Sequence, residues 1–133
     1  MVTAALVRPR VLVVDDEGDL TYVLVRLLQA MGCEAKDCCD PCDCVESAKR
    51  LKPHLVLLDL IMPRLDGFRV AEQLRRLEQP RPMIVALTGF VDSGSKQKAK
   101  AVGVHSLFEK PLTREVLRRL VHEASVLASR ENA

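Results

Sequence analysis

Apolar residues are gathered in three unbroken runs, and each run ends in polar residues. The runs cover residues 11–14, 55–58 and 83–87. Continuous rather than alternating apolar character is typical of parallel strands that are covered on both faces. Two further strands are expected around residues 34–38 and 104–108, where the pattern is less clear. The pattern therefore predicts five strands.

Helical spacing of apolar residues follows each of these strands. The expected helices run from residue 19 to a stop at Gly32, over residues 41–51, 66–77 and 95–102, and onward from Thr113. Asp40 is expected to cap the second helix, with Pro41 at its first position, and Thr113 to cap the last. Alternation of strand and helix predicts an α/β domain: a doubly wound, five-stranded parallel sheet with five helices.

The bulk composition excludes several classes of protein. The chain has 133 residues, which suits one domain, and a net charge of +2, which gives no reason to expect nucleic acid or a membrane surface as partner. No apolar run approaches the roughly 20 residues that span a bilayer. The start of the chain lacks the apolar core of a signal peptide. We therefore expect a cytoplasmic protein.

Polar residues collect where the predicted strands end. Asp15 and Asp16 follow the first strand, Asp59 the third, Thr88 the fourth, and Lys110 the fifth. In open α/β sheets, ligands bind beyond the carboxyl ends of the strands. These five side chains are therefore expected to meet at one edge of the sheet.

Charge repulsion indicates what this group could bind. Three close carboxylates destabilise one another unless a cation joins them, and Mg²⁺ or the similar Mn²⁺ prefers such oxygen ligands. Lys110 would supply a second cation for phosphoryl oxygens, and the Thr88 hydroxyl a hydrogen-bond donor. A carboxylate is an established nucleophile in phosphoryl transfer. The residues thus point to phosphoryl chemistry assisted by a metal ion.

Four motifs in order carry a resemblance to a known family. They are Val-Val-Asp-Asp-Glu at 13–17, Leu-Asp-Leu-Ile-Met-Pro at 58–63 with Asp66-Gly67, Ala-Leu-Thr-Gly at 86–89, and Glu-Lys-Pro at 109–111. Over residues 9–128 the chain resembles a CheY-like response-regulator receiver domain of two-component signalling, which leaves short tails at 1–8 and 129–133. The resemblance implies a flavodoxin-like strand order, 2-1-3-4-5.

The resemblance also implies a role for each residue of the acidic group. Asp59 matches the phospho-acceptor, which receives its phosphoryl group from a histidine kinase or phosphotransfer protein. Asp16 matches the direct metal ligand, and Asp15 the ligand that often acts through water. The backbone carbonyl of Ile61 is expected to complete the protein's share of the metal shell.

The remaining family positions concern the switch and its output. Thr88 resembles the hydroxyl that moves toward the phosphoryl group, and Lys110 the lysine that pairs with it, with a cis Lys110–Pro111 bond. The output face of the family is the fourth helix, fifth strand and fifth helix. Basic residues on that face suggest an acidic protein partner: Lys96, Lys98, Lys100, Arg114, Arg118 and Arg119.

Two departures from the family pattern change the expectations. The position that usually holds Tyr or Phe, three residues before the lysine, holds Leu107, and Phe108 would point to the opposite face of the strand. We therefore expect the loop after Thr88 and the fourth helix to respond without a rotating ring. Ile61 and Phe90 stand where relatives often have polar side chains, so self-dephosphorylation is expected to be slow.

Other interpretations stay open at this point. The chain is not expected to be an enzyme beyond its own phosphorylation and dephosphorylation, although a small phosphatase on the same fold is an alternative. It could also be the receiver part of a hybrid histidine kinase, or a protein-binding module that works without phosphorylation. The phosphatase would need a substrate pocket and a further acid beside Asp59, and the sequence offers no candidate acid besides those expected to hold the metal.

Five cysteines crowd into twelve residues: Cys33, Cys38, Cys39, Cys42 and Cys44. An odd number in a tight cluster does not resemble a disulfide framework. Cys39 and Cys42 have the Cys-x-x-Cys spacing of redox motifs, and a helix start would lower the pKa of the Cys42 thiol. The alternatives are a zinc site, for which finger spacing is missing, and ordinary core or surface residues.

Overall fold

A five-stranded parallel sheet forms the centre of the protein. The structure is a computed structural model that describes residues 7–38, 40–62, 65–77 and 81–131. The strands of the sheet are β1 (Arg10–Val14), β2 (Glu34–Cys38), β3 (Leu55–Asp59), β6 (Met83–Thr88) and β7 (Ser106–Glu109). They lie in the order β2-β1-β3-β6-β7, all parallel. Counted along the chain, this is the expected order 2-1-3-4-5, and the predicted fold is confirmed.

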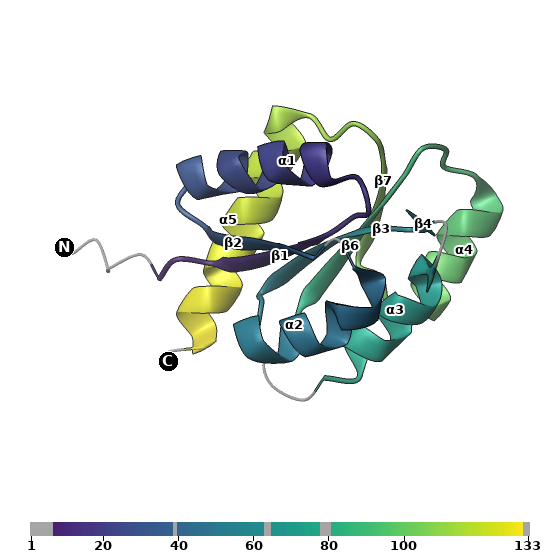
Figure 1. The fold of residues 1–133 in the computed structure, drawn as a ribbon, viewed down its shortest axis with the longest axis horizontal. Helices are drawn as coiled ribbons and strands as arrows, with labels where there is room; N and C mark the ends of the chain where they lie inside the picture. Colours follow the sequence, from purple (N-terminus) through teal and green to yellow (C-terminus); the bar gives the residue numbers. More distant parts are fainter. Residues whose placement is uncertain (1–6, 39, 63–64, 78–80, 132–133) are drawn as a thin grey trace.

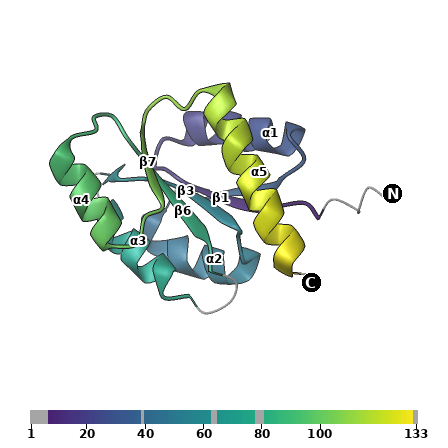
Figure 2. The same ribbon diagram turned by 180° about the vertical axis from the view of Figure 1, so that it is seen from behind.

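Helices cover both faces of the sheet. Figures 1 and 2 show α1 (Gly18–Ala30) and α5 (Arg114–Glu131) on one face, and α2 (Cys44–Leu51), α3 (Gly67–Arg75) and α4 (Ser93–Ala101) on the other. Val11 and Val13 of β1 pack in the core beneath α1 and α5, whereas Leu12 and Val14 pack beneath α2 and α3. Because both faces are buried there, the interiors of β1, β3 and β6 are continuously apolar, whereas the edge strand β2 has exposed polar residues.

Side-chain caps fix where several helices begin. The Thr113 hydroxyl accepts the Val116 N–H at 3.1 Å, so this predicted cap is confirmed. The Asp92 carboxylate accepts the Ser95 N–H at 2.7 Å, and α4 therefore begins at Ser93, two residues earlier than expected. Caps of this kind satisfy N–H groups that have no partner within the helix.

Other element boundaries also differ from the sequence expectations. The expected helix 41–51 starts as a 3₁₀ turn over Pro41–Asp43, because the Asp43 N–H donates to the carbonyl of Asp40, three residues back. Two short antiparallel strands that were not predicted, β4 (Ile61–Met62) and β5 (Leu65–Asp66), form a second small sheet after Asp59. Both differences are local, and neither alters the order of the main strands.

The end of α5 is tied to the start of the sheet. Glu131 accepts hydrogen bonds from the Arg10 guanidinium, at 2.8 Å, and from Nε2 of His54, which is buried. His54 Nδ1 accepts the Arg10 N–H at 2.9 Å. We call these three residues the terminal cluster. It lies where β1 begins and α5 ends, which are at the same end of the molecule (Figure 1). The helix runs three residues past the expected domain end at 128.

Candidate functional site

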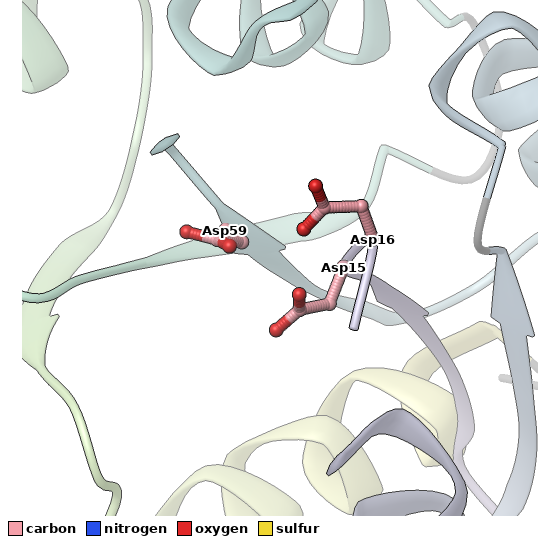
Figure 3. Close-up of side chains that lie close together, drawn as sticks. All are labelled: Asp15, Asp16 and Asp59. Carbon is pink, nitrogen blue, oxygen red and sulfur yellow. The ribbon is translucent and has the colours of Figure 1, made fainter. Parts of the chain in front are cut away.

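The polar residues singled out from the sequence lie at one edge of the sheet. Asp59 and Thr88 are the last residues of β3 and β6, Asp15 follows β1, and Lys110 follows β7. The parallel register pairs Asp59 with Leu87 and Thr88 with Glu109, so the strand ends are level. Figure 3 shows the carboxylates of Asp15, Asp16 and Asp59 gathered where β1 and β3 end.

Lys110 joins the buried carboxylates. Its Nζ lies 3.0 Å from Asp15 Oδ2 and 3.1 Å from Asp59 Oδ2. The other oxygen of Asp59 accepts the Ile61 N–H at 3.0 Å, and the other oxygen of Asp15 accepts the Glu17 N–H at 3.0 Å. Each of these two carboxylates is therefore held by one lysine bond and one backbone bond. The Lys110–Pro111 peptide bond is cis, as the resemblance implied.

The site carries more negative than positive charge. Burial raises the pKa of Asp59, against the lowering by the Ile61 N–H and Lys110. Burial tends to lower the pKa of Lys110, but its bonds to Asp15 and Asp59 outweigh that effect and leave the pKa raised. The two pKa shifts together indicate that the charge of Lys110 is well compensated, while the charge of Asp59 is not.

The donor set fits a small divalent cation. One oxygen from each of Asp15, Asp16 and Asp59 lies within 4.8 Å of the others. Asp16 is exposed, and its side chain makes no hydrogen bond within the described ranges. Three carboxylates against one lysine leave a net negative charge, and hard oxygen donors are what Mg²⁺ prefers. The expected ligation by the Ile61 carbonyl stays a prediction; what is shown is that the Ile61 amide binds Asp59.

Thr88 is engaged with the loop that follows it. Its hydroxyl is buried, donates to the carbonyl of Phe90 at 3.3 Å, and accepts the Phe90 N–H at 3.4 Å. One residue further, the Val91 N–H donates to the Glu109 carboxylate at 3.3 Å. Sequence reasoning missed this role of Glu109, because only the pairing of β6 with β7 places it beside the loop. Thr88 and Glu109 together hold the start of the loop.

The structure shows where the residues that depart from the family pattern lie. Leu107 packs against the core cluster beneath α2, α3 and α4, and Phe108 packs against the cluster beneath α1 and α5. The ring of Phe108 therefore lies on the opposite face from the side chain of Leu107. Ile61 and Phe90 are 66% and 68% exposed. These two apolar side chains follow Asp59 and Thr88 by two residues each.

Four of the five cysteines can be placed. Cys33, Cys38 and Cys44 are buried and Cys42 is exposed, all four as free thiols, while Cys39 lies outside the described residues. Burial raises the pKa of Cys44 to about 12 and also raises the pKa of Cys33 and Cys38. These three thiols pack as small apolar residues. Within the described ranges, the cluster with metal-binding geometry is the acidic group and includes no cysteine.

Comparison with known proteins places the chain in a family. The model of the response regulator receiver domain matches residues 11–122, and the chain belongs to this family. It is 32% identical over 121 residues to the probable transcriptional regulator ycf27 of Porphyridium aerugineum, covering 85% of this chain and 50% of the relative. It is 30% identical over 112 residues to the histidine-protein kinase BarA of Escherichia coli K12, covering 84% of this chain and 12% of the relative.

Solved structures show the same architecture. The chemotaxis protein CheY4 of Vibrio cholerae superposes with a TM-score of 0.80 at 27% identity, covering 88% of this chain and 98% of that one. The chain spans about half or less of the length of the curated relatives named above. No helix in the part of the chain that the structure describes has the length and apolar character needed to cross a membrane. Fold and family together make this a receiver domain of the two-component class.

Proposed function

We propose that the chain is a signalling switch that accepts a phosphoryl group on Asp59. The observation that carries this is the convergence of Asp59 with Lys110, Asp15 and Asp16 at the carboxyl edge of the sheet. Asp59 has one oxygen aligned by the Ile61 N–H and the other bound to Lys110, as Asp15 has with Glu17 and Lys110, and Asp59 is the one of the two that matches the phospho-acceptor of the family. Such a carboxylate is positioned to attack along one direction.

The transfer of the phosphoryl group to Asp59 forms one bond to phosphorus and breaks another. An Asp59 carboxylate oxygen attacks the phosphorus of the donor and forms a P–O bond. The P–N bond of a phosphohistidine, or the P–O bond of acetyl phosphate, breaks, and its electron pair leaves with the imidazole or the acetate. Lys110 moves from the carboxylate oxygen to the phosphoryl oxygens and neutralises part of their charge. The protein is consumed once per transfer, so it acts as a substrate rather than a turnover enzyme.

The proposed phosphoryl transfer includes a bound divalent ion. Asp15, Asp16 and Asp59 would hold Mg²⁺ or Mn²⁺, with the Ile61 carbonyl as a further ligand. When bound, such an ion neutralises charge on the transferring phosphoryl group and aligns it. The chain's own residues contribute the nucleophile, the lysine and the backbone N–H of Ile61 that fixes one oxygen of Asp59.

The response to phosphorylation would begin at Thr88. Its hydroxyl carries one hydrogen and cannot donate it both to the Phe90 carbonyl and to a phosphoryl oxygen, so binding the phosphoryl group would release that carbonyl. The loop from Gly89 to Asp92 leads directly into α4, whose first turn is capped by Asp92. Movement of Thr88 therefore reaches α4 along the backbone, without an aromatic ring.

Two surfaces are proposed for protein partners. A protein donor must bring its phosphoryl group to Asp59, and an apolar groove of about 230 Å³ between α1 and the segment after β7 adjoins the site, lined by Leu20, Val23, Lys110 and Leu112. The downstream partner would bind the face of α4, β7 and α5. Basic residues of that face are exposed, which favours an acidic partner: Lys96, Lys98, Lys100, Arg114, Arg118 and Arg119.

Intact-mass measurement after incubation with acetyl phosphate tests the proposal. Wild-type protein with Mg²⁺ should gain the mass of one phosphoryl group, and the gain should be absent in Asp59→Asn and when the metal is chelated. Asp66→Asn is the matched control, because Asp66 is an exposed carboxylate at the start of α3. An unmodified wild-type protein, or a gain that persists in Asp59→Asn, would contradict the proposal.

A further inference from the structure

A second cavity lies at the opposite end of the sheet from Asp59. Its volume is about 540 Å³, and Met83 and Ile84, the first residues of β6, form part of its wall. The register pairs Met83 with Leu55, four residues before Asp59 on β3, so the cavity adjoins the amino edge of the sheet. Its size falls in the range of small-ligand pockets, roughly 300–1,000 Å³. Nothing in the proposed phosphoryl chemistry uses this part of the molecule.

Three arginines from separate segments line this cavity. Arg75 ends α3, Arg81 precedes β6, and Arg130 lies in the last turn of α5. None of the three forms an ion pair with a carboxylate of the described residues. Basic residues at helix ends complement the helix dipole, which accounts for Arg75 and Arg130. The helix dipole does not account for Arg81, which lies outside the helices, or for the cavity between the three arginines.

Two of the hydrogen-bond donors at the wall are held in place. The Arg75 side chain crosses Gly103 so closely that a Cβ there would lie 2.2 Å from Arg75 Cδ, and its Nη1 lies 3.5 Å from the carbonyl of Ala101. His105 Nδ1 accepts the Ile84 N–H at 3.2 Å. The other ring nitrogen of His105 therefore carries the hydrogen in the neutral imidazole and is available as a donor. The wall presents donors in fixed positions.

The rest of the lining is apolar except for one carboxylate. Met83, Val126 and Leu127 contribute the apolar surface, and Val126 remains 36% exposed despite its size. Glu123 of α5 also lines the cavity and would accept hydrogen bonds from hydroxyl groups of a ligand. Inorganic phosphate would use the arginines and leave both the apolar wall and Glu123 without contacts. The lining suits a larger molecule with an anionic end.

We propose that this cavity binds a small phosphorylated ligand with a planar body and hydroxyl groups, for which a mononucleotide is the simplest class. The phosphate would bind the guanidinium groups, which match phosphate oxygens in pairs. The base would lie against Met83, Val126 and Leu127, and the sugar hydroxyls would donate to Glu123. Because the cavity is remote from Asp59, the site works whether or not Asp59 is phosphorylated.

Titration calorimetry with adenosine monophosphate and guanosine monophosphate, beside inorganic phosphate and adenosine, tests the proposal. A mononucleotide should bind at least about tenfold more tightly than phosphate or adenosine, a difference of about 1.4 kcal/mol. Arg81→Gln and Arg130→Gln should each weaken binding by about tenfold. Arg119→Gln is the matched control, since Arg119 is an exposed arginine of α5 that does not line the cavity.

Amide NMR spectra locate the binding and separate it from the phosphorylation site. Saturation with nucleotide should shift the signals of Met83, Gly103 and His105, and Asp59→Asn should bind nucleotide as wild type does. Three results would each overturn the proposal: no binding at millimolar nucleotide, binding that Arg81→Gln and Arg130→Gln leave unchanged, or phosphate binding as tightly as nucleotide.

Discussion

Asp59 and Thr88 are the last residues of their strands, and an exposed apolar side chain follows each of them. Ile61 and Phe90 each follow a site residue by two positions and remain largely exposed. Hydrolysis of an acyl phosphate needs a water molecule that is oriented by polar groups. Neither side chain offers a hydrogen bond, so the residues that border the site predict a long-lived phosphorylated state.

Polar replacements should shorten that lifetime. The double variant Ile61→Asn, Phe90→Glu is expected to lose its phosphoryl group about ten times faster than wild type, because each new side chain can hold a water near the phosphorus. The decay is followed by intact mass after removal of acetyl phosphate. Val91→Asn serves as the control, since it changes a residue of the same loop one position further on. Equal decay rates in wild type and the double variant would refute this account of the two residues.

Gly67 allows α3 to approach the backbone of Asp59 and Leu60 closely. A Cβ at this position would lie 2.6 Å from Leu60 Cα and 2.9 Å from the carbonyl oxygen of Asp59, and backbone atoms cannot move aside cheaply. Gly67→Ala should therefore lower the free energy of unfolding by about 2 kcal/mol or more. Gly18→Ala is the control, because nothing lies within 4 Å of a Cβ there. Similar denaturation midpoints for the two variants would count against the close approach.

At the scale of elements, the sequence predicted the strands and helices that a repeated apolar pattern marks. It missed the elements whose position depends on a single contact or on a very short pairing. The continuous apolar runs of β1, β3 and β6 identified buried parallel strands, and the polar residues after them identified the site. The small β4–β5 sheet was missed because two-residue strands are too short to show any periodicity. The start of α4 was missed because it depends on one cap, from Asp92.

Hydrogen bonds between residues far apart in the chain also could not be predicted from the sequence. Glu109 bonds the loop after Thr88, and Glu131 bonds His54 from 77 residues away. Glu109 belongs to the Glu-Lys-Pro motif, but nothing in that motif indicates a bond to this loop, and Glu131 does not differ in type or spacing from other charged residues of the surface. Only the paired strands and the docked helix bring these carboxylates to their partners, so their roles follow from the fold and not from a motif.

The path from the site to α4 yields a prediction at the same scale. Beryllofluoride, a phosphoryl mimic, should shift amide NMR signals of the loop from Gly89 to Asp92 and of α4, while the ring signals of Phe108 stay in place. The reason is that Thr88 leaves Phe90 when it binds the mimic, whereas Phe108 packs on the opposite face from Leu107. Asp59→Asn with beryllofluoride is the control. Changes confined to residues next to Asp59 would contradict the proposed path.

For the whole molecule, the terminal cluster links stability to pH. Burial lowers the pKa of His54 below its usual value, and the bond to Arg10 lowers the pKa of Glu131. The unfolded chain therefore binds more protons than the folded one as pH falls below about 6.5. The contribution of the terminal cluster to the free energy of unfolding is therefore complete above that pH. It is lost as the pH falls, first when His54 becomes protonated and, at lower pH, when Glu131 does. Both groups act in the same direction.

Chemical denaturation between pH 7.5 and pH 5 tests this linkage. The free energy of unfolding of wild type should fall with decreasing pH, with at most about 1.4 kcal/mol per pH unit from His54. His54→Gln should flatten the curve in this range, because position 54 then carries no titrating ring. His122→Gln, which removes an exposed histidine of α5, should retain the wild-type curve. A wild-type slope that survives in His54→Gln would exclude this histidine as its source.

The most direct test of the central claim is to identify the residue that carries the phosphoryl group. After reaction with acetyl phosphate and Mg²⁺, borohydride reduces an aspartyl phosphate to homoserine, and peptide mass spectrometry locates that change. The account predicts homoserine at position 59, with Asp15 and Asp16 unmodified in the same digest. Homoserine at either of those positions, or a phosphoryl group that remains on a serine, threonine or histidine after reduction, would contradict the assignment of Asp59 as the phospho-acceptor.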